Sequence, residues 1–558
     1  MTVLKEDKQA EKGEAITGQR CAVRMHNGKG CGRPIHAGPS DADEEPVCLM
    51  HSKDPNKSDA AFQDEIEHIL WRAGEGDADF SHFVFPSADY TGREFRAKCT
   101  FGFATFTQKA TFSAATFMQH ANFHKAMFTR EVYFSWAEFA QSAFFSEAMF
   151  TQCVMFIRTE FTQGAVFSEA TFMQDGSFDD AEFTGNAFFS KAAFRQDAAF
   201  RGATFTREAY FEETVFEKSA EFFGAMFERR VEFRGTGFRE DTEIQPGPMF
   251  SLGRFERPEL VLFYKTYLGQ ALFHNCDVSR FQFSSVRWRG RHGNDKRMVF
   301  DEIIDAKDSA AGALRTKSES PDDRNYDLIA ELYQQLKKNY DDKRDYWTAG
   351  DFHYGEMEMK RKATPKPNRA SRWLADRIKK SFAANRPSFP ARWAKDKGYS
   401  ERSFHIFRRE WHQRSGLAAW YKRASEYGES YGRPLLWLAG ALIFFTVLYP
   451  LLGLHPALRA GGGQAAGHGS LSRDAAVPEL SYRNYFHYGS LQPVSEKLGF
   501  HALLGHSLMT SVGVAVLQRD LAYEPSYPWA RAFSWLEHTL TSTLIALFLL
   551  AVRRQFRR

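Results

Sequence analysis

Phenylalanine recurs along the chain in steps that alternate between five and six residues. The series runs unbroken from Phe101 to Phe238, and a small residue, most often alanine, stands two positions before each Phe. An amphipathic helix needs apolar residues three and four apart, and an ordinary strand needs alternation, so neither explains this period. The pattern instead predicts a square coil of about 22 residues, in which each side turns one Phe and one small residue inward.

Residues that lie one coil apart are expected to stack in ladders. One such ladder consists of Phe106, Phe128, Phe150, Phe172, Phe194 and Phe216. Because neighbouring strands lie about 4.8 Å apart, residues 101–238 would form a rod on the order of 30 Å long with the phenyl rings as its core. Five-residue spacing returns from Phe263 to Trp288, after an irregular insertion expected at 239–262. The solenoid is therefore predicted over 80–290.

The repeated Ala-x-Phe unit, as at 104–106 and 115–117, resembles the pentapeptide-repeat family. The resemblance implies a right-handed quadrilateral β-helix. Some members of that family imitate DNA with a strongly acidic surface and bind topoisomerases. Residues 101–238 hold 12 Lys/Arg against 17 Asp/Glu, a balance of −5, which is mild for a DNA mimic. A DNA-mimic topoisomerase regulator is therefore an alternative that the charge does not favour.

Three cysteines and a histidine lie close together near the start of the chain. They are Cys21, Cys31, Cys48 and His51. Three thiolates and one imidazole suit a closed tetrahedral zinc site, and a metal would fold a segment too poor in apolar residues for its own core. The zinc would be structural, because four protein ligands leave no open position. His26 and His36 are alternative fourth ligands, and the simpler alternative is three unrelated cysteines beside a surface histidine.

Helical spacing follows the solenoid. Leu328, Leu332 and Leu336 share one face of a predicted helix, and 349–359 predicts a second, antiparallel helix. The stretches 332–340 and 349–362 resemble a segment that follows the repeats in bacterial membrane-anchored pentapeptide-repeat proteins. Glu356 and Glu358 lie two apart and face differently on a helix, so we expect them on a solvated face rather than at a metal.

Two apolar stretches, 434–454 and 533–552, predict membrane-spanning helices, because each is long enough to cross about 30 Å of hydrocarbon. The neck at 366–433 holds 17 Lys/Arg and 6 Asp/Glu, whereas the loop at 455–532 holds 6 and 5. The positive-inside rule therefore places the N-terminal domains and the C-terminus in the cytoplasm, with the hairpin in a bacterial inner membrane. The interleaved basic and aromatic residues of the neck then favour lipid as a partner, and no nucleic acid is expected.

A third apolar stretch, at 499–518, predicts a re-entrant or interfacial helix, since a third crossing would put the arginine-rich tail outside. This plan resembles a two-helix pore-loop channel, although Thr-Ser-Val-Gly-Val at 510–514 departs from the Thr-Val-Gly-Tyr-Gly of a potassium filter.

Glu537 lies within the second predicted span. A carboxylate inside a membrane is by default functional, and the alternative is that Glu537 lies at the level of the lipid headgroups. The candidate pore residues are Glu537, His538, His506, Ser507, Thr510, Ser511 and Gly513.

The predicted fold is mixed: a quadrilateral β-helix, an α-helical linker domain and a two-span α-helical hairpin. Six cysteines in 558 residues indicate a reducing compartment rather than a disulfide scaffold. The predicted divisions are a disordered tail (1–18), a zinc-binding module (19–60), a helical connector (61–79), the solenoid (80–290), a linker (291–322), a helical hairpin (323–362), a basic neck (363–433) and a transmembrane domain (434–558).

The sequence thus predicts an ion-channel-like protein whose cytoplasmic solenoid binds an unknown partner or ligand and gates the membrane domain. Two spans cannot enclose a pore, so a homo-oligomer is implied, most simply a tetramer. We expect no enzymatic activity, because the sequence holds no recognisable nucleophile–base pair or phosphate loop. The same plan is compatible with a membrane-anchored scaffold without conduction, and with a membrane-depolarising effector in antiviral defence.

Overall fold

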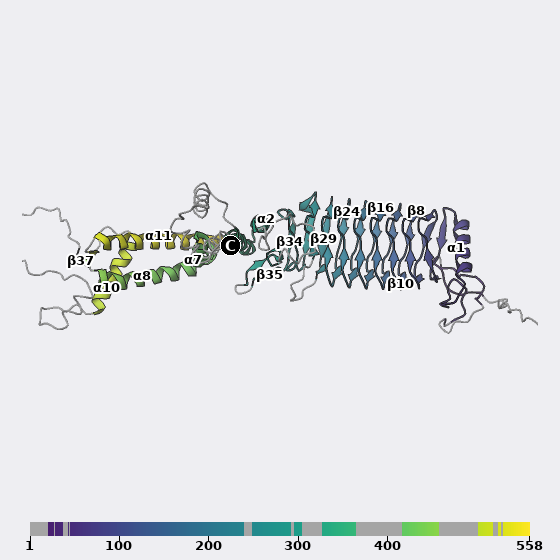
Figure 1. Ribbon diagram of the computed structural model, residues 1–558, viewed down its shortest axis with the longest axis horizontal. Helices are drawn as coiled ribbons and strands as arrows, with labels where there is room; N and C mark the ends of the chain where they lie inside the picture. Colours follow the sequence, from purple (N-terminus) through teal and green to yellow (C-terminus); the bar gives the residue numbers. More distant parts are fainter. Residues whose placement is uncertain are drawn as a thin grey trace, which may run out of the picture. The chain divides into compact units, whose positions relative to one another are not determined.

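The computed structural model describes residues 20–26, 28–36, 43, 45–238, 248–291, 295–303, 326–363, 416–452, 454–456, 500–516, 523–525 and 528–557. The chain forms two compact units, Met1–Glu356 and Met357–Arg558, and each is described by itself (Figure 1). The predicted tail at 1–18 lies outside the described residues, as do most of the predicted linker at 291–322 and of the neck at 363–433.

Four parallel sheets form the faces of a β-solenoid in the first unit (Figure 1). Each coil gives one short strand to each face, so strands four apart in the chain pair in register. The first face holds β1 (Asp77–Asp79), β5 (Lys98–Thr100), β9 (Ala121–Asn122), β13 (Ala143–Phe144), β17 (Ala165–Val166), β21 (Ala187–Phe188), β25 (Ala209–Tyr210), β29 (Val231–Arg234), β33 (Val261–Tyr264) and β34 (Gln282–Ser284). The second face holds β2 (Val84–Phe85), β6 (Thr105–Phe106), β10 (Met127–Phe128), β14 (Met149–Phe150), β18 (Thr171–Phe172), β22 (Ala193–Phe194), β26 (Val215–Phe216) and β30 (Gly237–Phe238).

The two remaining faces each contain eight strands. The third face holds β3 (Ala88–Asp89), β7 (Ala110–Thr111), β11 (Val132–Tyr133), β15 (Val154–Met155), β19 (Gly176–Ser177), β23 (Ala198–Ala199), β27 (Ala220–Glu221) and β31 (Pro248–Met249). The fourth face holds β4 (Glu94–Phe95), β8 (Thr116–Phe117), β12 (Glu138–Phe139), β16 (Glu160–Phe161), β20 (Glu182–Phe183), β24 (Thr204–Phe205), β28 (Met226–Phe227) and β32 (Arg254–Phe255).

Stacked phenyl rings fill the solenoid, which confirms the predicted fold. The Phe106 and Phe128 rings lie 4.6 Å apart and the Phe128 and Phe150 rings 5.1 Å apart, nearly parallel in both pairs. Rings of adjacent ladders meet edge to face, as Phe150 does with Phe156 at 85°. The rest of the predicted ladder, Phe172, Phe194 and Phe216, is equally buried. Each ring therefore has both apolar burial and favourable ring geometry, the latter adding about 0.5–1.5 kcal/mol per pair.

Sharp corners separate the faces and force some side-chain-bearing residues into the left-handed region. Lys125, Glu147, Glu169 and Lys191 occupy the same corner in successive coils with φ between 54° and 60°. A left-handed residue other than glycine costs roughly 1–2 kcal/mol. Hydrogen bonds between coils hold the corner in place, as from the Lys125 N–H to the Ser146 carbonyl at 2.9 Å.

The expectation of an irregular insertion over 239–262 is wrong in its extent. β31 pairs with β27 and β32 pairs with β28, so regular coils resume by residue 248, and residues 239–247 lie outside the described part. Phe250 stacks on Phe222 with ring centroids 5.2 Å apart. The number of residues per coil is therefore larger here than in the other coils, but β31 and β32 still pair in register with β27 and β28.

Helices cover both ends of the solenoid. Helix α1 (Asp59–Ala73) lies at the first coil, and helices α2 (Tyr326–Asp342) and α3 (Tyr346–Lys362) follow the last coils. The side-chain amide of Asn339 donates to the carbonyls of Val278, Ser279 and Phe281 at 2.7–3.1 Å. Backbone groups at the open edge of the last coil are thereby satisfied. Smaller elements nearby are η1 (Pro258–Leu260), η2 (Phe300–Glu302), β35 (Arg289–Gly290) and β36 (Arg297–Met298).

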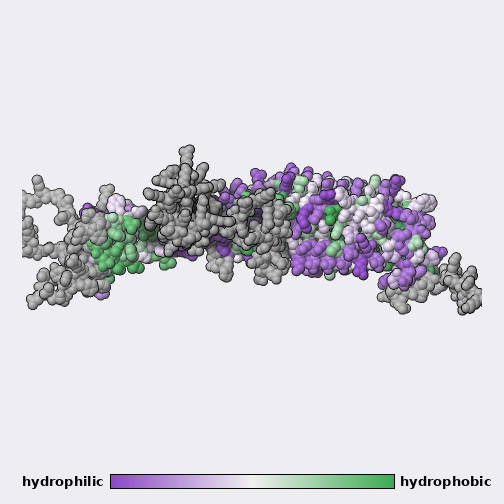
Figure 2. Space-filling model, in the orientation of Figure 1, coloured by the Kyte–Doolittle hydropathy of each residue, from purple (hydrophilic) through white to green (hydrophobic). Residues whose placement is uncertain are grey.

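The second unit is a helical hairpin. Its elements are α7 (Leu417–Ser425), α8 (Gly432–Leu452), β37 (Leu454–Pro456), α10 (Phe500–Ala515), β38 (Tyr523–Pro525) and α11 (Pro528–Arg557). The helical stretches Gly432–Leu452 and Arg531–Arg554 are long and apolar enough to cross a membrane. Helix α10 packs against both of them, and β37 pairs with β38 where the two helices meet. Figure 2 shows apolar surface gathered over this hairpin, whereas the visible solenoid surface is largely polar.

Candidate metal centre and hairpin core

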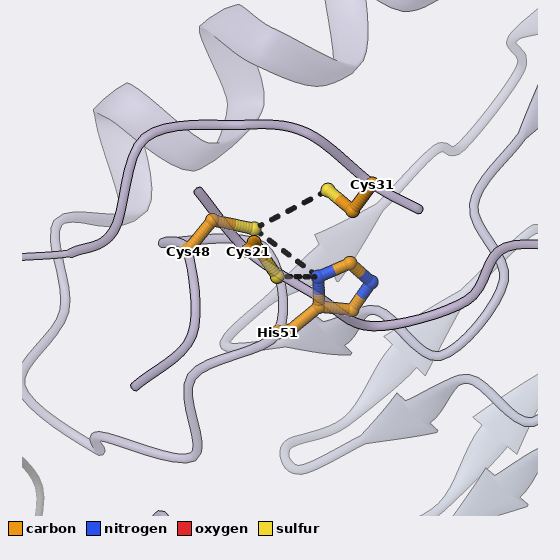
Figure 3. A group of neighbouring side chains, drawn as sticks. All are labelled: Cys21, Cys31, Cys48 and His51. Atoms are coloured by element: carbon orange, nitrogen blue, oxygen red, sulfur yellow. Dashed lines mark hydrogen bonds between the residues drawn. The ribbon is translucent and has the colours of Figure 1, made fainter. Parts of the chain in front are cut away.

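The three cysteines and the histidine predicted as metal ligands lie together (Figure 3). Antiparallel bridges between Arg20 and Pro34 and between Arg24 and Gly30 bring Cys21 beside Cys31. A tight turn, closed by the His51 N–H on the Cys48 carbonyl at 3.0 Å, supplies the other two ligands. The four ligand atoms lie within 4.8 Å of one another.

The spacing of these atoms fits a tetrahedral ion. Zinc–sulfur bonds of about 2.3 Å place two sulfurs about 3.8 Å apart, and the Cys31 and Cys48 Sγ atoms are 3.7 Å apart. Nδ1 of His51 lies 3.4 Å from the Cys21 sulfur and 3.1 Å from the Cys48 sulfur. Its Nε2 lies 3.3 Å from the Ser81 carbonyl, which orients the ring with Nδ1 toward the sulfurs. The group can hold a metal ion with all four ligands.

The surroundings of the cluster favour a thiolate at Cys31. Hydrogen bonds from Cys48, His51 and Arg33 lower the pKa of the Cys31 thiol against the opposing effect of burial. The Arg33 guanidinium lies 3.3 Å from the Cys31 sulfur and also pairs with Glu65 at 2.9 Å. Three thiolates with one divalent cation would carry a net charge of −1, and this guanidinium would offset it. Of the two histidines considered in place of His51, His26 is exposed and His36 lies 4.0 Å from the Asp54 carboxylate.

A buried lysine that sequence reasoning missed joins this module to the solenoid. The Lys57 ammonium donates to the carbonyls of Leu49 at 3.1 Å, Ser52 at 2.8 Å and Val84. The Val84 N–H in turn donates to the Met50 carbonyl at 2.8 Å. The metal module and the first coil therefore share backbone hydrogen bonds. No signal in the sequence around Lys57 marks these contacts, because two of the carbonyls belong to the turn of the metal module and the third, that of Val84, lies 27 residues further along the chain.

The hairpin encloses a polar cluster centred on Glu537 of α11. This carboxylate is fully buried and accepts hydrogen bonds from the Tyr449 hydroxyl of α8 at 2.5 Å and from the Ser511 hydroxyl of α10. Thr541, one turn further along α11, is buried and donates to the Glu537 carbonyl at 2.8 Å. One carboxylate therefore links all three helices. Tyr449 was not among the predicted residues, because 88 positions separate it from Glu537.

The other predicted pore residues are divided between the core and the surface of the hairpin. Ser507, Thr510 and Gly513 are buried, and the Ser507 hydroxyl has no hydrogen-bond partner among the described residues. His538 is half-buried, and its Nδ1 lies 3.2 Å from the Val514 carbonyl. His506 is exposed. The structure thus brings Ser511 to Glu537 but does not bring His506 there.

The expectation that Glu356 and Glu358 occupy a solvated helix face is wrong, since both are buried. In the first unit, Glu356 lies 3.4 Å from the Lys337 ammonium. In the second, Glu358 lies 3.0 Å from Lys422 and 2.5 Å from Arg361. Burial raises the pKa of Glu358, but the hydrogen bonds and charges of these two cations outweigh it and lower that pKa to about 2. The nearby Arg361 and the distant Lys422 together offset the cost of burying Glu358.

The comparisons with known proteins bear on the solenoid. The family model for pentapeptide repeats, nine copies long, matches residues 178–226 and 189–237. No curated protein matches the chain. The matched segment lies within the stacked coils from β19 to β30, where the strands and the phenyl ladders repeat without interruption. The β-solenoid is therefore built from pentapeptide repeats, and two helices long and apolar enough to cross a membrane follow it in the chain.

Proposed function

We propose that the chain is a bacterial inner-membrane protein in which α8 and α11 cross the bilayer, with the N-terminal domains and the C-terminus in the cytoplasm. The exposed large apolar side chains of α8 and α11, among them Leu436, Ile443, Leu549 and Leu550, support this placement. A surface of that kind is favourable against hydrocarbon and unfavourable in water. Arginines at the outer ends of the hairpin, such as Arg433 and Arg553, support the orientation.

The hairpin forms a channel-like homo-oligomer, most simply a tetramer, that the solenoid gates when it binds a partner. The observation that carries this proposal is the buried carboxylate of Glu537, which accepts hydrogen bonds from α8 and α10. A carboxylate inside an apolar bundle is costly and sets the relative positions of the helices that bond to it. The proposed function is gated ion flux and involves no enzymatic step.

Ion flux from liposomes that hold the full-length protein tests this function. Glu537→Gln keeps the shape but removes the charge, so we expect flux to change at least tenfold. Thr543→Val is the matched control, because Thr543 lies on the same helix and its hydroxyl donates to its own helix at the Thr539 carbonyl. Equal flux in the wild type and Glu537→Gln would overturn the role of the carboxylate, and no flux under any condition would overturn conduction.

A membrane-anchored scaffold is the second candidate function. The first face of the solenoid carries a half-buried outward ladder of apolar side chains, which pair in register from coil to coil. Its members are Phe144, Val166, Phe188 and Tyr210. Such a surface suits a protein partner. A partner captured by wild type and lost by Phe188→Asp, with no flux from liposomes, would favour the scaffold over the channel.

The metal is proposed to be a structural Zn²⁺. Three thiolates and one imidazole, with sulfurs 3.7 Å apart, match its preferred ligands and geometry. Metal analysis of the purified chain should give one zinc per chain, and Cys48→Ser should remove it. Cys276→Ser is the control, because that buried cysteine lies in the solenoid. A chain that folds without bound metal would overturn the proposal.

A further inference from the structure

Helix α7 exposes apolar and aromatic side chains. Leu417 is 90% exposed and Trp420 is 54% exposed, and they lie three residues apart on one side of the helix. Near the start of α8, Trp437 is 51% exposed, and its indole N–H donates to the Arg423 carbonyl at 3.3 Å. This bond ties the end of α7 to the beginning of the apolar helix. We call Leu417, Trp420, Arg423 and Trp437 the α7 surface.

Arg423 differs from the other cations around it. Each of three neighbouring cations lies within 3.2 Å of a carboxylate; these pairs are Lys422–Glu358 at 3.0 Å, Arg433–Glu426 at 2.5 Å and Arg554–Glu429 at 3.2 Å. Arg423 is exposed and, among the described residues, has no carboxylate within 4.0 Å. Its guanidinium instead lies 5.6 Å from the centre of the Trp420 ring. Within the described part of the chain, one positive charge is therefore left for an external anion, with an aromatic ring beside it.

The combination of groups fits the headgroup layer of a membrane. Trp side chains favour this layer because the ring is apolar while the indole N–H needs a polar partner. The α7 surface is continuous with the apolar surface of α8, where Leu436 lies next to Trp437 and is also exposed. Lipid would cover the α7 surface and the apolar surface of α8 as one continuous patch, whereas a soluble protein partner would not need the two surfaces to be continuous. The Arg423 guanidinium, which has no carboxylate partner among the described residues, complements a phosphate.

We propose that α7 lies along the cytoplasmic face of the membrane and that Arg423, between Trp420 and Trp437, binds the headgroup phosphate of an anionic phospholipid. The proposal rests on the proposed insertion of α8 and α11. It makes α7 an interfacial strap that precedes the first span. The other occupants of this surface, a second copy of the chain or a soluble protein, are outcomes of the tests below.

The first test measures binding of phosphatidylglycerol to the full-length protein in detergent by native mass spectrometry. Arg423→Gln should weaken binding about fivefold, the effect of one basic residue near an anionic surface. Arg531→Gln is the matched control. Arg531 is an exposed arginine near the first residue of α11, whereas Arg554, which pairs with Glu429 just after α7, lies near the last. Wild-type binding by Arg423→Gln would overturn the phosphate site, and so would an equal loss in the control.

The second test measures quenching of tryptophan fluorescence by phospholipids brominated near the headgroup, with the full-length protein in vesicles. Trp420→Phe should remove a quenched component. Trp71→Phe, which alters an exposed tryptophan of α1 in the first unit, should remove an unquenched one. Trp535→Phe reports insertion of α11. A quenched Trp535 component beside an unquenched Trp420 component would overturn the α7 proposal alone, as expected if protein covers this surface. If neither the Trp420 component nor the Trp535 component is quenched, membrane insertion itself would be overturned.

Discussion

In the solenoid, the side chains stacked inside the coils are phenyl rings, whereas in the hairpin the group shared by three helices is the Glu537 carboxylate. The solenoid repeats one set of contacts from coil to coil, so each coil depends on its neighbours alone. The hairpin has one set of contacts, joined by residues far apart in sequence. The comparison teaches that damage to a repeated core affects the neighbouring coils alone, whereas each group of a single polar core bears on all the helices that share it.

Removing the metal should have the largest effect on stability and should stay local. Structural zinc contributes on the order of 10 kcal/mol to the folding of small modules. The described links between this module and the first coil include Lys57, the Val84 N–H and the contact of His51 with the Ser81 carbonyl. After chelation, hydrogen exchange should show loss of protection over 20–57 and unchanged protection over 101–238. Unfolding of the whole solenoid would contradict the view that coils depend on their neighbours alone.

Truncating one phenyl ring should be the next largest effect. Phe150→Ala leaves a cavity between Phe128 and Phe172, so we expect the free energy of unfolding to fall by about 3–5 kcal/mol. Met149→Ala, one residue earlier and exposed, should change it by less than about 0.5 kcal/mol. Denaturant unfolding of the full chain measures both. Similar losses in the two variants would show that burial in the ladder is not the source of stability.

Two buried carboxyl groups should give the two units opposite responses to pH. In the second unit, the folded pKa of Glu358 is about 2, below its ordinary value of 4.5. Its contribution is therefore present above pH 4.5 and is lost as pH falls toward 2, by about 3 kcal/mol. Glu358→Gln should abolish this dependence, and Glu331→Gln, at an exposed site on α2, should not. An unchanged acid response in Glu358→Gln would contradict the assignment.

At the end of the solenoid, burial raises the pKa of Asp301 from 3.8 to about 7. The folded state then binds a proton that the unfolded state lacks between these values, so stability falls as pH rises from 3.8 to 7, by on the order of 4 kcal/mol. Asp301→Asn retains an oxygen for the Phe273 N–H and should flatten the unfolding free energy across this range. A persistent slope in that variant would assign the pH dependence to another group.

The smallest expected effect is at a corner of the solenoid. Lys191 has φ of 58°, so Lys191→Gly should stabilise the chain by roughly 0.5 kcal/mol after the added flexibility of the unfolded chain is subtracted. Lys218→Gly, an exposed residue outside the left-handed region, should be destabilising. Thermal unfolding of both variants provides the measurement. Stabilisation by both or by neither would show that corner strain has no bearing on stability.

The phenyl ladder could be predicted from the sequence because each coil repeats the same local pattern, so one contact implies all the others. Cys48 and His51 could be predicted because three positions of one turn bring them together. The Tyr449 partner of Glu537 could not be predicted, since it lies 88 residues away. The same holds for Tyr427, whose hydroxyl also donates to the Glu358 carboxylate at 3.0 Å and which lies 69 residues from it. Neither buried carboxylate has a local pattern that differs from an exposed one.

Membrane topology tests the central claim most directly, namely that the hairpin crosses the bilayer twice with both ends in the cytoplasm. A membrane-impermeant maleimide can be applied to right-side-out vesicles containing Ser470→Cys or Arg558→Cys. The native cysteines lie before residue 277, within the domains assigned to the cytoplasm, and should stay unlabelled. The account predicts that Cys at 470 reacts at once and that Cys at 558 reacts only after permeabilisation. Reaction of both sites or of neither in sealed vesicles would contradict it.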